Sequence, residues 1–126
     1  MAKILVVDDE AHLRRVVSLY LRARNYELDT AENGVEAIHK VAIDRPDLII
    51  ADIGMPGMDG YQLMRRIRAS EPKARRVPAV ALTAFARAED RKRAIIAGYQ
   101  THLAKPFDIA ELIIVVAGLL GRAEQR

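Results

Sequence analysis

Short apolar runs alternate with segments of helical periodicity along this chain, and that alternation limits the fold more than any other feature. Five segments are expected to form strands, at residues 3–8, 27–31, 47–51, 77–83 and 101–104, and the first of them is expected to be buried. Five segments with apolar side chains every three or four residues are expected to form helices, at residues 13–24, 34–43, 60–69, 87–97 and from 108 onward. Strict alternation predicts an α/β fold with a parallel sheet and helices on both faces.

Composition narrows the class of protein. A chain of 126 residues with 51% hydrophobic content is expected to form a single domain, residues 1–126, around one buried core. The absence of cysteine excludes disulfides and thiol chemistry. No charged, apolar leader and no membrane-length apolar stretch is evident, so we expect a cytoplasmic protein without membrane insertion.

Basic residues outnumber acidic ones, twenty to seventeen, but they are scattered in groups along the chain. One such group is Arg65, Arg66 and Arg68. Each group lies in or beside a predicted amphipathic helix, which is typical of solvated faces. With no recognisable binding motif, we expect no direct contact with nucleic acid.

Acidic residues stand where two of the apolar runs end. Asp8 and Asp9 follow the first run, and Asp52 closes the third. If the two strands are neighbours in a parallel sheet, all three carboxylates reach one edge. Crowded carboxylates repel one another, which raises their proton affinity unless a hard cation such as Mg²⁺ neutralises them. The spacing therefore predicts a magnesium site.

Four motifs, each at the end of a predicted strand, carry a resemblance to a known family. They are Val6-Val7-Asp8-Asp9-Glu10, Asp52 with Met55-Pro56 and Asp59-Gly60, Leu82-Thr83-Ala84, and Lys105-Pro106-Phe107. In this order they resemble the receiver domain of bacterial two-component response regulators, the CheY-like family, over essentially the whole chain. The resemblance implies a flavodoxin-like, doubly wound sheet with the strand order 2-1-3-4-5 known from CheY.

The resemblance also implies roles for individual residues. Asp52 would accept a phosphoryl group from the phosphohistidine of a histidine kinase or phosphotransfer protein. Thr83 and Lys105 would contact the phosphoryl oxygens, and Lys105-Pro106 is a candidate cis peptide bond. Mg²⁺ would be held by Asp8, Asp9, Asp52 and the backbone carbonyl of Gly54. Such a protein is a reversible switch for a downstream protein target, rather than a turnover enzyme.

Two other functions compete with the switch. An autonomous Mg²⁺-dependent phosphohydrolase would also use Asp52 as nucleophile. It would need a general acid two residues later, where this chain has Gly54, and an insertion to enclose a substrate. A flavodoxin-like nucleotide binder would need a glycine-rich loop after the first strand, where Asp8-Asp9-Glu10 would instead repel phosphate.

Some residues depart from the family pattern or have simpler explanations. His102 stands where many receivers carry Tyr or Phe, and with Phe85 it resembles receivers of hybrid sensor kinases, whereas the N-terminal sequence resembles a regulator. The sequence does not decide between a receiver of a hybrid kinase and a regulator.

Three aspartates have simpler explanations to weigh. Asp59 and Asp108, the latter with Glu111 as a capping box, are interpreted as helix N-caps. Asp9 is either an N-cap or a metal ligand, and we favour the ligand.

The final helix has an apolar outer position. Seven side chains share one broad inward face: Ile109, Leu112, Ile113, Val115, Val116, Leu119 and Leu120. Ile114 points the other way, flanked by Ala110 and Ala117. This patch is either a docking surface for a partner or a second copy, which would make a homodimer, or a lone exposed isoleucine, which is common.

Overall fold

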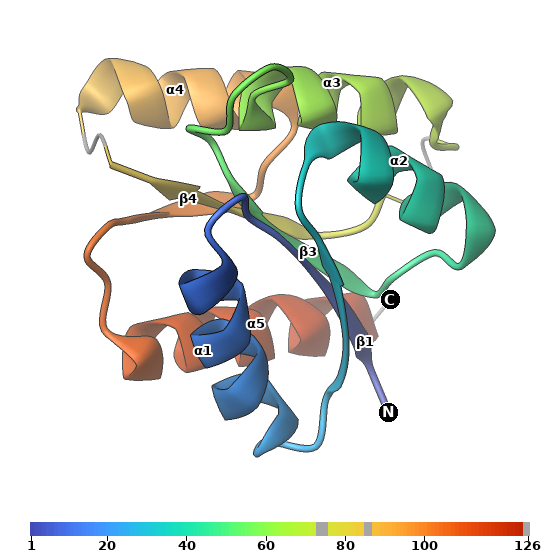
Figure 1. The fold of residues 1–126 in the computed structure, drawn as a ribbon, viewed down its shortest axis with the longest axis vertical. Helices are drawn as coiled ribbons and strands as arrows, with labels where there is room; N and C mark the ends of the chain where they lie inside the picture. The colour runs from blue at the N-terminus through green and yellow to red at the C-terminus, as the bar shows by residue number, and fades with distance from the viewer. Residues whose placement is uncertain (73–75, 85–86, 125–126) are drawn as a thin grey trace.

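A computed structural model describes residues 1–72, 76–84 and 87–124, and for residues 122–124 the backbone alone. The described residues form a five-stranded sheet with helices on both faces (Figure 1). The strands are β1 Lys3–Val7, β2 Glu27–Ala31, β3 Leu48–Asp52, β4 Ala79–Thr83 and β5 Thr101–Ala104. The helices are α1 Ala11–Arg22, α2 Gly34–Ile43, α3 Gly60–Ser70, α4 Ala88–Ala97 and α5 Ile109–Glu124.

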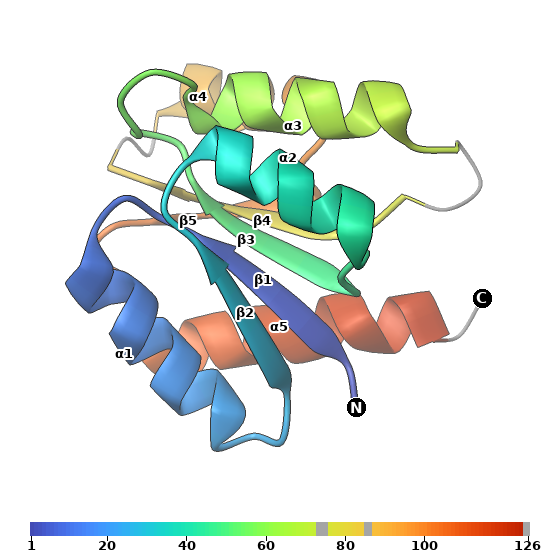
Figure 2. The same ribbon diagram turned by 45° about the vertical axis from the view of Figure 1, so that its right-hand side comes forward.

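The sheet order is β2-β1-β3-β4-β5 and every neighbouring pair is parallel, which confirms the predicted topology. Helices α1 and α5 cover one face of the sheet, and α2, α3 and α4 cover the other (Figure 2). The winding direction reverses between β1 and β3, and in sheets of this kind ligands bind beside that point, at the carboxyl ends of the strands.

Two hydrophobic cores lie on the two faces of the sheet. Alternate residues of the central strands supply them: Leu5 and Ile49 belong to the core under α2, α3 and α4, while Ile4 and Ile50 belong to the core under α1 and α5. The predicted inward face of α5 is confirmed, since its members all belong to the second core or pack against it. On α2 the helical spacing of Val35, Ile38 and Val41 predicts that all three side chains face inward. Ile38 and Val41 do pack against the core, but the prediction for Val35 is wrong, because its side chain is 69% exposed.

Several predicted boundaries shift by one or two residues. Strand β3 includes Asp52 itself, so the third acid stands in the strand rather than after it. Strand β4 begins at Ala79, because Pro78 before it has no N–H for the ladder. Helix α5 begins at Ile109, and the Asp108 carboxylate caps it by accepting a hydrogen bond from Ala110 N–H at 3.0 Å. Glu111 N–H is bonded to the Asp108 carbonyl instead.

The start of α3 is fixed against the end of β3. Asp59 forms a capping box with Gln62, as its N-cap interpretation predicts. Gly60 N–H donates to the Ile53 carbonyl at 2.9 Å, and the buried Tyr99 hydroxyl donates to the Gly60 carbonyl at 2.8 Å. A Cβ at Gly60 would lie 2.6 Å from the Asp52 carbonyl oxygen, so only glycine fits this approach.

We therefore expect Gly60→Ala to destabilise the protein by about 1–3 kcal/mol, the usual cost of overpacking. The two nearest atoms that the new methyl group would meet are backbone atoms of Asp52 and Ile53, which cannot rotate away, and the third is the Ile53 Cδ1 atom. Urea denaturation measures the effect. Gly118→Ala is the control. Gly118 lies on the exposed side of α5, and a Cβ there would meet nothing within 4 Å, so alanine should raise the free energy of unfolding by about 0.5–1 kcal/mol. Equal stability of Gly60→Ala and the parent would contradict this account.

A buried ionic network lies at the amino ends of β4 and β5, at the end of the sheet opposite to Asp52. Arg68 of α3 donates to the Gly98 carbonyl at 3.1 and 2.8 Å and to the Val77 carbonyl at 2.7 Å. It also pairs with Glu71, which accepts from Val77 N–H at 2.8 Å and pairs with Arg45 at 3.0 Å. The side chains of Arg68 and Glu71 are only 8% and 5% exposed, so the solvated face predicted for Arg68 is wrong.

The outer side of α5 is exposed and weakly apolar, as the sequence predicts. Ile114 is 71% exposed, and Ala110 and Ala117 beside it are exposed as well. Among the described residues, no helix combines the length and the apolar character needed to cross a bilayer.

Candidate functional site

The predicted acidic cluster forms at the carboxyl edge of the sheet. Asp52 ends β3 and Asp8 follows β1, and pairing of Val7 with Ala51 brings the two acids to the same level. Asp8 and Asp52 are buried, whereas Asp9 is exposed. One carboxylate oxygen from each of the three residues lies within 4.8 Å of the others. The fold thus brings together the acids that the sequence places at separate strand ends.

Lys105, after β5, directs its ammonium group into this cluster. Its Nζ lies 3.1 Å from Asp52 Oδ1 and 3.4 Å from Asp8 Oδ2. Its N–H donates to the Thr83 carbonyl at 2.7 Å, and the Lys105-Pro106 bond is cis. Thr83 is buried at the end of β4, one residue beyond Leu82, which pairs with Asp52. Both residues therefore lie at the same edge as the acids.

The charges in this cluster perturb one another. Burial raises the pKa of Asp8 above its usual range and the Asp52 carboxylate adds to the rise, while the Glu10 N–H and Lys105 oppose it. Burial alone would lower the pKa of Lys105, but the Asp8 and Asp52 carboxylates outweigh it, so that pKa is raised. The ammonium group therefore stays charged at neutral pH.

Backbone and side-chain donors orient the two buried acids. Asp8 Oδ1 accepts from Glu10 N–H at 2.9 Å, and Asp52 Oδ1 accepts from Gly54 N–H at 3.2 Å. The Arg14 guanidinium donates to the Asp8 carbonyl at 2.6 Å, a contact that the sequence does not signal beyond a basic residue on the first turn of α1. The N-cap of α1 is Glu10, so the cap interpretation of Asp9 is wrong.

The donor set of this edge fits a hard divalent cation. Three carboxylates face the single ammonium group of Lys105, which leaves an excess of negative charge in a partly buried site. Carboxylate oxygens are among the ligands that Mg²⁺ prefers, and the three acids supply them. Gly54, whose carbonyl is the fourth predicted ligand, contacts Asp52 through its N–H. Gly54 has no side chain, so the position two residues after Asp52 offers no general acid.

His102 lies on the edge strand β5, paired with Ala81. Paired residues of parallel strands point to the same face, and Ala81 belongs to the core under α3 and α4. The half-buried His102 ring is therefore on the α4 side of the sheet. Phe85, its predicted companion in the resemblance, lies outside the described residues.

Comparison with known proteins identifies relatives of this arrangement. A sequence model of the response regulator receiver domain matches residues 4–117. The transcriptional regulatory protein ResD of Bacillus subtilis is 46% identical over 98% of this chain and 50% of its own length. An uncharacterised 14.6 kDa protein of Leptolyngbya boryana is 41% identical over 90% of this chain and 86% of its own. The chain thus spans about half the length of ResD.

Solved structures agree with the sequence relatives. The chemotaxis protein CheY4 of Vibrio cholerae matches with a TM-score of 0.88 and 33% identity, over 94% of this chain and 98% of that one. The receiver domain of the sensor histidine kinase PA1611 from Pseudomonas aeruginosa, described with a magnesium ion in its active-site cleft, matches with a TM-score of 0.85 and 38% identity, over 95% and 98%.

Proposed function

Because the chain belongs to the family of response regulator receiver domains, we propose that it is a Mg²⁺-dependent switch phosphorylated on Asp52. One observation carries this proposal. Asp8, Asp9 and Asp52 converge at one edge of the sheet, and Lys105 reaches the two buried acids among them. A hard cation and a fixed ammonium group beside one carboxylate are what phosphoryl transfer requires, since the transferred group carries dispersed negative charge.

The phosphoryl donor is the phosphohistidine of a kinase or phosphotransfer protein. An Asp52 carboxylate oxygen forms the new P–O bond as the P–N bond breaks, and the histidine nitrogen keeps the electron pair of that bond. Lys105 neutralises part of the charge on the phosphoryl oxygens, and the Thr83 hydroxyl donates a hydrogen bond to one of them. Asp8, Asp9, Asp52 and the Gly54 carbonyl would hold Mg²⁺, which would supply further neutralisation of the phosphoryl oxygens.

The same residues connect phosphorylation to the surface. Thr83 ends β4 and Lys105 follows β5, and a backbone hydrogen bond of 2.7 Å joins them. A phosphoryl group on Asp52 attracts both side chains, so the loops after β4 and β5 change conformation together. Those loops lead into α4 and α5, whose outer surfaces are then reshaped for a downstream protein target.

Acetyl phosphate or beryllofluoride with Mg²⁺ is expected to modify or occupy the parent protein but not Asp52→Asn. Intact-protein mass spectrometry detects the phosphoryl adduct, and the beryllofluoride complex is followed by amide chemical shifts. Asp59→Asn is the control, because it changes an aspartate in the same loop whose cap role asparagine also fills. A mass increase that persists in Asp52→Asn would place the acceptor elsewhere.

Partners follow from the family and from the length of the relatives. The sensor kinase PA1611 contains a receiver similar to this chain, and ResD is named a transcriptional regulator of about twice its length. The likeness to a kinase receiver supports a histidine kinase or phosphotransfer protein as the upstream partner. A protein target downstream is proposed from the family alone. We expect these 126 residues to act without touching nucleic acid themselves.

The outer side of α5 is proposed as a contact between two copies of the chain. Ile114 is exposed between Ala110 and Ala117, a flat and weakly apolar surface. In analytical ultracentrifugation the parent is expected to sediment as a dimer, and Ile114→Glu is expected to sediment more slowly, as a monomer. Val35→Glu, a comparably exposed apolar position on α2, should leave the coefficient unchanged. Identical sedimentation of the parent and Ile114→Glu would contradict the proposed contact between two copies.

A further inference from the structure

The positive charge of this chain is concentrated in one segment. Between Asp59 and Gly98 the sequence holds ten of the twenty basic residues but only four of the seventeen acidic ones. The remainder holds ten basic and thirteen acidic residues, an excess of acid. The segment includes α3 and α4, which pack against each other on the same face of the sheet (Figure 1). These two helices by themselves carry six basic residues and two acidic ones, so this face is more basic than the net charge of +3 indicates.

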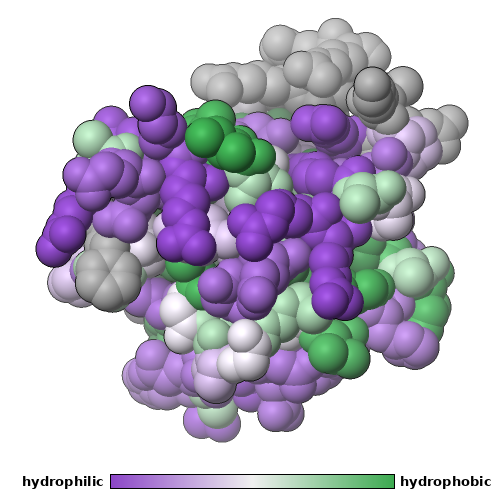
Figure 3. All heavy atoms as spheres, turned by 90° about the horizontal axis from the view of Figure 1, so that it is seen from above, coloured by the Kyte–Doolittle hydropathy of each residue, from purple (hydrophilic) through white to green (hydrophobic). Residues whose placement is uncertain are grey.

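Much of this charge faces solvent. Figure 3 looks down on this face and shows it as mainly hydrophilic, with only isolated apolar patches. Arg65 and Arg66 on α3 are exposed, as are Arg91 and Lys92 on α4. Within the part of the chain that the structure describes, none of these four side chains has a carboxylate at ion-pair distance, in contrast to Arg68.

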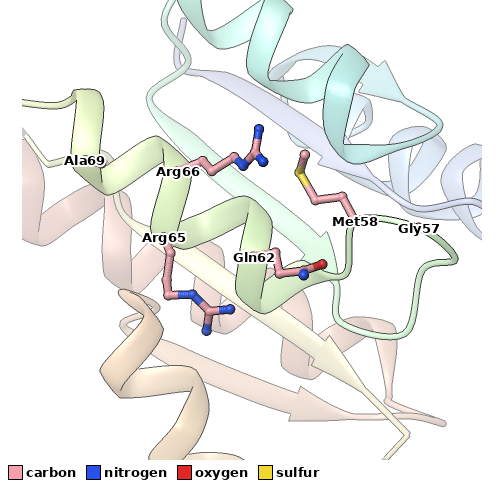
Figure 4. A pocket seen from close by; sticks show the side chains of 6 residues that line it. All are labelled: Gly57, Met58, Gln62, Arg65, Arg66 and Ala69. Atoms are coloured by element: carbon pink, nitrogen blue, oxygen red, sulfur yellow. The ribbon is translucent and has the colours of Figure 1, made fainter.

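A hollow of about 540 Å³ opens beside two of these arginines. Its lining residues are Gly57, Met58, Gln62, Arg65, Arg66 and Ala69. Figure 4 shows the side chains of Arg66 and Met58 reaching toward one another, with Gln62 between α3 and the loop, while Arg65 diverges toward α4. The hollow thus combines two guanidinium groups and an amide with an apolar wall made by Met58 and Ala69.

We propose that this basic hollow, lined by the six residues above, binds a segment of a partner protein rich in Asp and Glu. Guanidinium groups match carboxylates through paired, charge-assisted hydrogen bonds, and unpaired arginines can form them without breaking existing ones. Apolar side chains of the same segment pack on Met58 and Ala69. A phosphate backbone fits less well, because it offers no apolar side chain to pack on Met58 and Ala69.

Fluorescence anisotropy with a labelled acidic peptide tests this assignment. The probe is an amidated peptide of about 16 residues, long enough for partial helix formation, built from Glu, Leu and Ala with Glu at every third or fourth position. The parent is expected to bind it, and the double variant Arg65→Glu with Arg66→Glu to bind at least about tenfold more weakly, because like charges then face each other. A parent that does not bind the peptide overturns the proposal.

A matched double variant separates a specific site from general attraction. Arg15→Glu with Arg22→Glu makes the same change in net charge on α1, where both exposed arginines line a second hollow. This variant should alter binding by less than about twofold if the peptide binds the hollow beside Arg65 and Arg66. Equal weakening by the two double variants would overturn the proposal. Tighter binding of a DNA duplex, lost in the Arg65 and Arg66 variant, would instead assign the face to nucleic acid. Asp52→Asn should bind the peptide as tightly as the parent does. Peptide binding therefore tests this inference independently of the proposed phosphorylation of Asp52.

Discussion

Mg²⁺ at a hundred times its dissociation constant is expected to raise the free energy of unfolding by about 2.7 kcal/mol, through binding to the folded state alone. The physical reason is the excess of carboxylates over cations at the edge of the sheet, where Asp8, Asp9 and Asp52 face Lys105. Without metal, burial and mutual repulsion make these charges unfavourable. Thermal denaturation with and without Mg²⁺ measures the rise as a higher Tm.

Asp9→Asn is expected to abolish most of this rise, because it removes the exposed acid of the cluster and leaves the buried pair with Lys105. The rise should also weaken on acidification, since metal ligands must be deprotonated. Asp90→Asn is the control: it removes one aspartate from α4, outside the cluster, and should respond to Mg²⁺ like the parent. An equal rise in Asp9→Asn and the parent would refute the ligand assignment.

Arg68→Met is expected to cost about 3–5 kcal/mol, the usual effect of removing one partner from a buried ion pair. Glu71 would be left nearly buried with Arg45 as its cation, and the carbonyls of Gly98 and Val77 would lose their donor. Methionine keeps most of the volume, so the loss reports charge and hydrogen bonds rather than a cavity. Urea denaturation measures the difference from the parent.

The pH dependence of the same variant gives a second measurement. Burial alone would raise the pKa of Glu71, but the Val77 N–H, Arg68 and Arg45 outweigh it and hold that pKa below its ordinary value of 4.5. A carboxyl with a lowered folded-state pKa adds stability above its ordinary pKa and loses it as the pH falls through the folded-state value. The gap between the parent and Arg68→Met should therefore narrow below pH 4.5.

Arg65→Met provides the control for this pair of measurements. Arg65 lies on the exposed side of the same helix and has no carboxylate at ion-pair distance among the described residues. Its replacement should change the free energy of unfolding by less than about 0.5 kcal/mol. If Arg68→Met were as mild as Arg65→Met, the network would not be a source of stability.

Local patterns in the sequence predicted the elements well, with errors where periodicity is ambiguous. The pattern located all five strands to within two residues. The three central strands are the clearest, because a strand buried on both faces needs an unbroken apolar stretch. Val35 was misplaced because a short helix on the sheet can bury either of two adjacent stripes, and periodicity alone does not choose between them. Strand order came from the family resemblance, since pattern does not fix which strands are neighbours.

The sequence by itself determined which residues stand at the ends of strands, and therefore which chemical groups could meet: Asp8, Asp9, Asp52, Thr83 and Lys105. Alternation along the chain sets these positions, since each strand must end where its apolar run ends. Only the tertiary structure decided which charges became buried. Arg68 and Arg65 are alike in sequence, yet one is enclosed with Glu71 and the other faces solvent, because burial depends on what packs over a helix after folding.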